Sequence, residues 1–569
     1  MTSVHKLFEN TYENAIIKRH SLEANSPPAG YIEIERKPTL DVPDPIVESK
    51  DFDVLVSLTT GAGGKTPEVK VTQGNAKTPE QISLQLPEQD GWPIEVVLMA
   101  PDFVLPEGNR ATLFLQKIGD STPARFKLRA KPVRGPQQIS KIFATFWYKD
   151  AFLGKIERDA TIVTAAAVQQ GAPAPASVTP QATSAPEQQS GIRMKSNLLG
   201  ADLTIVTVKI PNSDQRQIFI GSRYLGGFTA PQIYSQSGLS DWLMTRYSDL
   251  SNKSAQLAQF GSADDATARI KLAEETKAFV RVFSGDLYEK FCPPLVKDAF
   301  WVLSKRIGAN FKTIQIYSDD FEFPWELMRP INIDGKERGL LGTEFAIGRW
   351  HITSASSGLE VPPKDLSINK LVVIAPHYAA PTQGLPTEIE TLKSMSGYEP
   401  VAGKFDDVKK LFQDFPLAII YFAGHGSILA TQGNLYRYSI QLEDRPLDVM
   451  TWRGMITSQA KNHPLLFFNA CSVGQTQNIA NFVDGWAPAV LDAGASGYVG
   501  ALWPVSQHGA GSFGTTFYRE FDRRLKLGRA SVAETLMQTR TKFFENGDPT
   551  FLAYVYFGDA DLGLLRPAK

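Results

Sequence analysis

The stretch LAIIYFAGHGSILA, residues 417–430, decides how the C-terminal part of this chain is expected to fold. Its continuous apolar run is typical of a β-strand that is covered on both faces, as strands of parallel sheets are. The run ends in Gly424-His425-Gly426, which places one imidazole between two glycines. A histidine that only packs does not need backbone freedom on both sides. The stretch therefore predicts a buried strand, and it leaves open whether His425 is packed or faces a substrate.

A second apolar run, PLLFFNA at 464–470, leads directly into Cys471. Ligand sites in open α/β sheets lie beyond the carboxyl ends of the strands. The segment between the two runs is long enough for a crossover, so the strands are expected to be neighbours. Thiol and imidazole would then emerge at the same edge of the sheet. A thiol nucleophile needs such a neighbour, because a free thiol with a pKa of ~8.5 is mostly protonated at neutral pH.

Each of these two residues also has an ordinary structural interpretation. A cysteine in an apolar strand is usually a small core residue, and a lone histidine is usually a hydrogen-bonded structural residue.

The glycine after the histidine adds a third feature, because an N–H without a neighbouring side chain can approach a substrate carbonyl closely. The backbone N–H groups of Gly426 and Cys471 are therefore candidates for an oxyanion hole.

Strands and helices alternate along residues 311–569, which predicts a C-terminal α/β domain with a mainly parallel sheet. Residues 193–310 combine two strands with long helical patterns and are expected to form the N-terminal part of the same region. Upstream, residues 51–163 contain short β-rich runs separated by turns, which favour an immunoglobulin-like β-sandwich. Residues 164–192 are rich in Ala, Pro, Gln and Ser and predict a disordered linker. Residues 1–50 are expected to form an N-terminal arm.

Composition excludes several classes of function. Lys and Arg number 59 against 60 Asp and Glu, so no net field attracts nucleic acid or an anionic membrane. No apolar run approaches the roughly 18 residues of a membrane-spanning helix, and the N-terminus lacks the apolar core of a secretory signal. The chain has only two cysteines, which favours a reducing cytoplasm. No cluster has the spacing of zinc ligands, and we expect neither a metal nor another cofactor.

Several motifs in order resemble the CHAT family, caspase-related cysteine peptidases of clan CD. They are FEFPWELMRPINIDGKERGLLGTEFAIGRW, YFAGHGS, NACSVG, GASGYVGALWPV and the terminal YVYFGD. The resemblance covers about residues 195–569. It implies a caspase-like α/β fold in which His425 is the general base, Cys471 the nucleophile and the backbone of Gly426 the oxyanion partner. Cys471 follows His425 by 46 positions, close to the roughly 50 that separate the two residues in caspases.

The resemblance implies a cysteine endopeptidase that cuts a protein target. We expect it to be latent until triggered within a bacterial signalling or defence system, antiviral defence included, with the sandwich as the docking site of an activating protein. Two alternatives stay open: a non-catalytic scaffold that retains the fold, and a thiol acyltransferase that uses the same dyad.

Substrate preference depends on the pocket. In metacaspases, which prefer basic P1 residues, the residue two before the cysteine is an aspartate, whereas here it is Asn469. An amide carries no charge, so a neutral or loosely specified P1 residue is expected. The alternative is that Asp444 or Asp484 supplies a charge from another loop. His377, which follows an apolar run, is a further candidate for the pocket wall.

Overall fold

The computed structural model describes most of the chain between residues 31 and 565. It does not cover 61–81, 88–90, 117–118, 134, 149–150, 165–199, 211–212, 226, 230, 260–265, 321–322, 333, 352–364, 379–384, 414–415, 417, 431–435, 456–462, 473–481 and 504. Most of the expected linker thus lies outside the described residues. In the residues that are covered, no helix is both long and apolar enough to cross a membrane.

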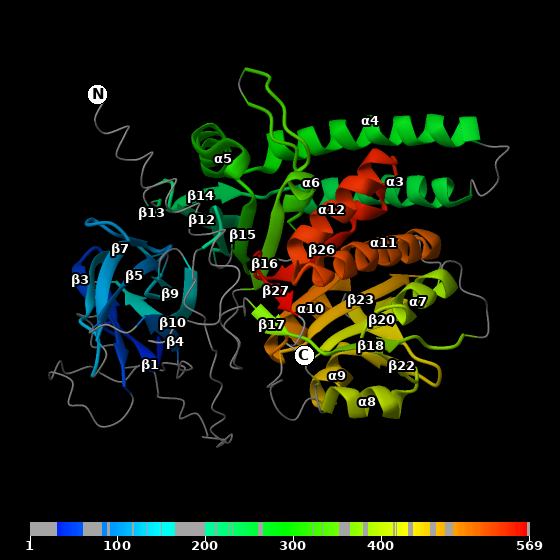
Figure 1. The fold of residues 1–569 in the computed structure, drawn as a ribbon. Helices are drawn as coiled ribbons and strands as arrows, with labels where there is room; N and C mark the ends of the chain where they lie inside the picture. The colour runs from blue at the N-terminus through cyan, green and yellow to red at the C-terminus, as the bar shows by residue number, and fades with distance from the viewer. Residues whose placement is uncertain are drawn as a thin grey trace.

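The C-terminal part is built on one large mixed sheet with helices on both faces (Figure 1). Its path runs β13-β12-β11-β15-β16-β26-β24-β23-β20-β18-β19, while β14 joins β12, and β21 and β22 extend from β20. The strands are β11 (Leu203–Lys209), β12 (Gln215–Ser222), β13 (Gly227–Phe228), β14 (Gln232–Ser235), β15 (Thr313–Ser318), β16 (Ala346–His351), β18 (Lys370–Ile374), β19 (Tyr398–Val401), β20 (Ala418–Ala430), β21 (Tyr436–Gln441), β22 (Pro446–Asp448), β23 (Leu465–Ser472), β24 (Gly497–Ala501) and β26 (Tyr554–Gly558).

The centre of the sheet consists of two parallel blocks that run in opposite directions, while β12, β13, β14, β21 and β22 pair antiparallel with their neighbours. One block comprises β11, β15, β16 and β26, and the other comprises β24, β23, β20, β18 and β19. The blocks meet at the antiparallel pair of β24 and β26. The carboxyl ends of the two blocks therefore lie at opposite edges of the sheet. The expected α/β architecture is confirmed, with a mixed sheet that is parallel within each block.

The helices form because their apolar residues recur at helical spacing. In α11, Phe513, Phe517, Phe521 and Leu525 are all buried, and Ser506 caps the first turn by accepting the N–H of Gly509 at 3.0 Å. The helices are α3 (Leu239–Gln259), α4 (Ala266–Phe291), α5 (Pro294–Ile307), α6 (Leu341–Glu344), α7 (Leu385–Lys393), α8 (Phe405–Gln413), α9 (Val449–Met455), α10 (Phe482–Asp492), α11 (Gln507–Lys526) and α12 (Val532–Glu545). Short 3-10 turns are η2 (Gly308–Asn310), η3 (Trp325–Leu327) and η4 (Pro549–Leu552), and a small sheet joins β17 (Asp365–Ser367), β25 (Arg529–Ser531) and β27 (Gly563–Leu565).

Aromatic contacts show which helices cover each face of the block that contains β20 and β23. Phe467 of β23 packs against Phe517 of α11 with ring centroids 5.1 Å apart. Its neighbour Phe468 packs against Trp486 of α10 at 5.0 Å on the other face. Because successive side chains of a strand alternate between faces, Asn469 is on the α11 side with Phe467.

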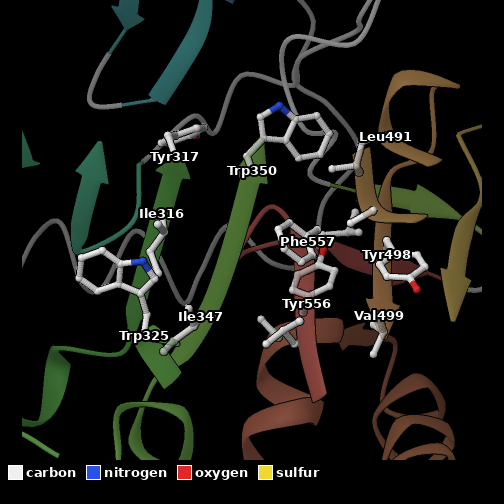
Figure 2. Packing of buried hydrophobic residues seen from close by; sticks show 14 of the residues in the cluster. Ile316, Tyr317, Trp325, Ile347, Trp350, Leu491, Tyr498, Val499, Tyr556 and Phe557 are labelled. Carbon is white, nitrogen blue, oxygen red and sulfur yellow. The ribbon is translucent and has the colours of Figure 1, made fainter. Parts of the chain in front are cut away.

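Buried hydrophobic side chains of β15, β16 and β26 continue into those of β24 across the junction between the two blocks (Figure 2). Glu326 is 3 % exposed and accepts the Nε–H of Arg349 at 2.9 Å. Arg540 approaches the same carboxylate at 3.9 Å. Removing one member of such a group leaves an uncompensated buried charge, which costs about 3–5 kcal/mol. Loss of Arg349 or Arg540 alone is therefore expected to destabilise the fold around Glu326.

The strands described between residues 31 and 163 form two five-stranded sheets, ordered β4-β1-β3-β8-β6 and β2-β10-β9-β5-β7. Residues 31–41 and 46–47, expected in an N-terminal arm, are strands of these sheets. The strands are β1 (Tyr31–Asp41), β2 (Ile46–Val47), β3 (Asp51–Thr59), β4 (Ile82–Pro87), β5 (Gly91–Met99), β6 (Phe103–Val104), β7 (Arg110–Gln116), β8 (Ala124–Ala130), β9 (Gln137–Tyr148) and β10 (Ala151–Val163).

The hairpin of β9 and β10 contacts the C-terminal sheet. Trp147 and Phe152 both pack on Tyr317, with ring centroids 5.5 and 4.8 Å apart. Burial and the nearby Lys155 of the hairpin lower the pKa of His351 to about 3. Tyr317 and His351 lie at the carboxyl ends of β15 and β16. The N-terminal part therefore docks at the edge opposite to the carboxyl ends of β20 and β23.

This contact predicts that Phe152→Ala loosens the N-terminal part without unfolding the C-terminal sheet. The variant removes a buried ring, at a cost of about 3–5 kcal/mol, and its contact with Tyr317. Small-angle X-ray scattering should show a larger radius of gyration than for the wild type. The matched control is Phe114→Ala, because Phe114 belongs to the same part but is 44 % exposed. An unchanged radius of gyration for Phe152→Ala would contradict the docking role of the hairpin.

Candidate active site

The two strands that end in His425 and Cys471 are immediate neighbours. β20 pairs with β23 in parallel, and the register places His425 opposite Cys471. Adjacent strands lie about 4.8 Å apart, so the backbones of the two residues are next to each other. Both residues lie near the carboxyl end of this parallel pairing, which ends at Gly426 and Ser472, although β20 itself continues to Ala430. The sequence-based expectation that these strands are adjacent is confirmed.

Tyr378, which follows β18, holds His425 from the side. Its hydroxyl accepts the backbone N–H of His425 at 3.1 Å and donates to the carbonyl of Gln441 at 2.8 Å. Its ring packs on the imidazole with centroids 4.3 Å apart. The tyrosine thus fixes both the backbone and the ring of His425. Sequence reasoning missed it, because a tyrosine after a strand has no local signal for such a contact.

The imidazole is half-buried, and burial lowers the pKa of His425 below its ordinary value. Because that value is about 6.5, the ring is mostly neutral at pH 7. A neutral imidazole can accept a proton from a neighbouring thiol, which is what a general base must do.

The structure gives Gly424 a packing role. Gly424 lies in the extended strand β20, and a Cβ atom there would come within 2.4 Å of the Tyr378 hydroxyl. The glycine is therefore required by the close approach of Tyr378, whereas the sequence had suggested backbone freedom. Gly426 is buried between Ile440 of β21 and Ser472 of β23. Its N–H remains a candidate oxyanion donor.

Asn469 lies beneath the strand ends, inside the protein. Its side-chain NH₂ donates to Glu388 at 2.5 Å and to the carbonyl of Ala510 at 2.9 Å, and its oxygen accepts the hydroxyl of Tyr554. The residue is 3 % exposed. Asn469 therefore links β23 to α7, α11 and β26. This placement does not support a role for Asn469 in the wall of a substrate pocket.

The other pocket candidates lie in three different settings. Asp444 is exposed, and its carboxylate accepts the N–H of Phe405 at 2.9 Å, at the start of α8. That bond lowers the pKa of Asp444. His377 is 95 % exposed, with Nδ1 3.2 Å from Glu443, and it directly precedes Tyr378. Asp484 lies in α10, and its side chain is outside the described part of the chain. Of the three, His377 lies closest along the chain to a residue that contacts His425.

Cys292 is the other cysteine of the chain. It lies at the end of α4 and is 5 % exposed. Burial raises the pKa of its thiol well above the ordinary value. Because the thiolate is the reactive form, Cys292 is unsuited to nucleophilic chemistry, and Cys471 is the remaining thiol.

Comparison with known proteins agrees with the resemblance found in the sequence. The family model of the CHAT domain matches residues 281–551, which include His425 and Cys471. No curated protein matches the chain.

Three solved structures are similar at low identity. The crystal structure of the Arg-specific cysteine proteinase gingipain R is 12% identical, covering 49% of this chain and 69% of that chain, with a TM-score of 0.31. The complex of the Porphyromonas gingivalis RgpB pro- and mature domains is 13% identical, covering 49% and 71%, with a TM-score of 0.30. One chain of the crystal structure of the Saccharomyces cerevisiae separase–securin complex is 10% identical with a TM-score of 0.37. That match covers 64% of this chain but only 30% of the matched chain.

The packing of Gly424 predicts that Gly424→Ala lowers thermal stability. The added methyl group would clash with the Tyr378 hydroxyl, and overpacking of this kind costs about 1–3 kcal/mol. Thermal unfolding should show a lower midpoint for this variant than for the wild type. Gly454→Ala is the matched control, because no atom lies within 4 Å of a Cβ at that position in α9. Equal midpoints for Gly424→Ala and Gly454→Ala would contradict the close approach.

Proposed function

We propose that the chain is a cysteine endopeptidase in which His425 and Cys471 form the catalytic dyad. The observation that carries the proposal is the register of β20 and β23, which sets these two residues side by side. The match of residues 281–551 to the CHAT domain supports it. So does the burial of Cys292, which leaves one thiol for the chemistry.

In the proposed reaction, His425 accepts the thiol proton of Cys471, and the thiolate attacks the carbonyl carbon of the scissile peptide bond. The tetrahedral intermediate collapses as the imidazolium gives its proton to the leaving amine. The result is a thioester between Cys471 and the N-terminal half of the substrate. A water molecule, deprotonated by His425, then attacks the thioester, releasing a carboxylic acid and restoring the thiol. The backbone N–H groups of Gly426 and Cys471 are the proposed donors to the oxyanion.

We further propose that the N-terminal part, as an immunoglobulin-like sandwich, serves as the docking site of an activating protein. It packs on the carboxyl ends of β15 and β16, at the edge opposite to the proposed dyad. In this arrangement an activator would act on the dyad through the sheet and its helices. The enzyme would be cytoplasmic, latent until triggered, and part of a bacterial signalling or defence system.

Cys471→Ala and His425→Ala should each abolish cleavage, because each removes half of one unit. The expected loss is on the order of a thousandfold or more, and the double variant should lose no more than either single one. The rate of cleavage is measured by digesting a peptide library and identifying the products by mass spectrometry. The chain is co-expressed with the proteins encoded beside it, so that an activating protein is present. Cys292→Ala is the matched control and should cleave like the wild type.

The outcome also separates the alternatives. Cleavage that survives in Cys471→Ala would contradict the dyad. Transfer of an acyl group to an added amine, with no free acid formed, would identify an acyltransferase. A scaffold would be identified if the wild type and Cys471→Ala bind a partner equally well and neither cleaves a peptide nor transfers an acyl group.

Tyr378→Phe should reduce kcat about tenfold with little change in KM. The variant keeps the ring on His425 but loses the acceptor of its backbone N–H and leaves the Gln441 carbonyl without that donor. Such buried unsatisfied groups cost about 1–3 kcal/mol. Tyr398→Phe, on the edge strand β19, is the control. A Tyr378→Phe variant with wild-type kcat would contradict the positioning of His425 by Tyr378.

A further inference from the structure

A buried carboxyl group lies directly beneath the proposed dyad. Glu388 of α7 is 3 % exposed, and its Oε1 atom accepts two hydrogen bonds. One comes from the hydroxyl of Tyr421 and the other from the side-chain NH₂ of Asn469 at 2.5 Å. Buried glutamates are rare unless they are paired, and the proposed reaction gives this one no role.

The two donors belong to the two strands that carry the dyad. Tyr421 is on β20, four residues before His425, and Asn469 is on β23, two residues before Cys471. Tyr421 also packs on Phe467, its register partner, with ring centroids 5.0 Å apart. One carboxyl oxygen thus joins the two strands within a few residues of their functional ends.

The same group is held from further elements. Asn469 also bonds the carbonyl of Ala510 in α11 and the hydroxyl of Tyr554 in β26. α11 approaches so closely that a Cβ atom at Gly514 would lie 2.3 Å from Glu388 Oε1 and 2.5 Å from the Tyr421 hydroxyl. Glu388 is therefore packed closely against α11, and its hydrogen bonds link the side chains of β20 and β23.

We propose that Glu388 is a positioning residue that holds His425 and Cys471 at reacting distance by joining β20 to β23 beneath them. This proposal rests on the function proposed above. It deepens that function by naming the group that keeps the dyad assembled.

The charge state of Glu388 gives the proposal a signature in pH. Burial raises the pKa of Glu388 to about 8, although the bonds from Tyr421 and Asn469 oppose the rise. The groups that face it are Tyr421 of β20, Asn469 of β23, Tyr518 and the Ala510 carbonyl of α11, and Tyr554 of β26. None of these groups is a cation. At neutral pH the carboxyl is therefore protonated, and its ionisation above pH 8 places an uncompensated charge between the strands.

Raising the pH is expected to lower the contribution of Glu388 to the stability of the fold. The folded protein holds this proton more tightly than the unfolded chain, in which the carboxyl has its ordinary pKa of about 4.5. The contribution of Glu388 to stability is thus fully present below pH 4.5 and is lost as the pH rises through about 8. Glu388→Gln, which cannot ionise, should not show this loss.

The test uses the full chain and four variants: Glu388→Gln, Glu388→Leu, the control Glu390→Gln, and His425→Ala. Glu390 is two residues away on α7, is 70 % exposed, and pairs with Lys393. The first readout needs no substrate: it is the rate at which iodoacetamide alkylates Cys471 at pH 6.5, measured by peptide mass spectrometry. A thiol next to His425 reacts faster at this pH than a free thiol of pKa ~8.5. His425→Ala provides the rate without the dyad.

If Glu388 positions the dyad, Glu388→Leu slows this alkylation at least tenfold, as His425→Ala does. Glu388→Gln, which can still accept both hydrogen bonds, stays within threefold of the wild type, and Glu390→Gln is unchanged. In peptide cleavage, Glu388→Leu lowers kcat at least tenfold with KM within twofold. The wild type loses activity as the pH rises through about 8, and Glu388→Gln loses less.

Two results would overturn the proposal. One is a folded Glu388→Leu variant that is alkylated as fast as the wild type while His425→Ala is slow; the dyad would then stand without Glu388. The other result is that Glu388→Gln loses activity and thermal stability as the pH rises through about 8 to the same extent as the wild type. This second comparison applies even if Glu388→Leu does not fold. Fast alkylation of His425→Ala would instead remove the dyad, and with it both proposals.

Discussion

The parallel pairing of β20 with β23 is the constraint on which the candidate site depends. Parallel strands cannot be joined by a tight turn, so the chain between them must cross over, and their carboxyl ends then share one edge. The register of this pair sets His425 opposite Cys471, and a slip by one residue would send one of the two to the other face. Side-chain contacts accompany this register: Glu388 accepts a hydrogen bond from each strand, and the Tyr378 hydroxyl accepts the backbone N–H of His425.

The two blocks of the sheet separate catalysis from docking in the proposed enzyme. Because the blocks run in opposite directions, the proposed dyad lies at one edge, and the contact of Trp147 and Phe152 with Tyr317 lies at the other. Any influence of the N-terminal part on the dyad must cross the sheet. The antiparallel junction of β24 and β26 lies on that route, and Tyr554 of β26 donates to Asn469 beside Glu388. β26 thus links the block that contacts the N-terminal part to the polar network beneath the proposed dyad.

The sequence predicted the elements that depend on local pattern. The apolar runs before His425 and Cys471 form β20 and β23, which are adjacent as expected. The contacts of Asn469 and Glu388 could not be predicted from the sequence, because they join residues that are far apart along the chain. Asn469 looked like a pocket residue because only its offset from Cys471 was visible, whereas its bonds come from α7, α11 and β26. Glu388 has no signal in its own helix, because an acidic residue in a polar stretch normally faces solvent.

The most direct measurement of the central claim is covalent labelling with a peptidyl acyloxymethyl ketone, which reacts with a thiolate only where an enzyme aligns it for attack. With a His425–Cys471 dyad, mass spectrometry of the labelled, activated chain finds the adduct on Cys471, and His425→Ala abolishes it. An adduct on Cys292, or equal labelling of Cys471 in the wild type and in His425→Ala, would contradict the dyad.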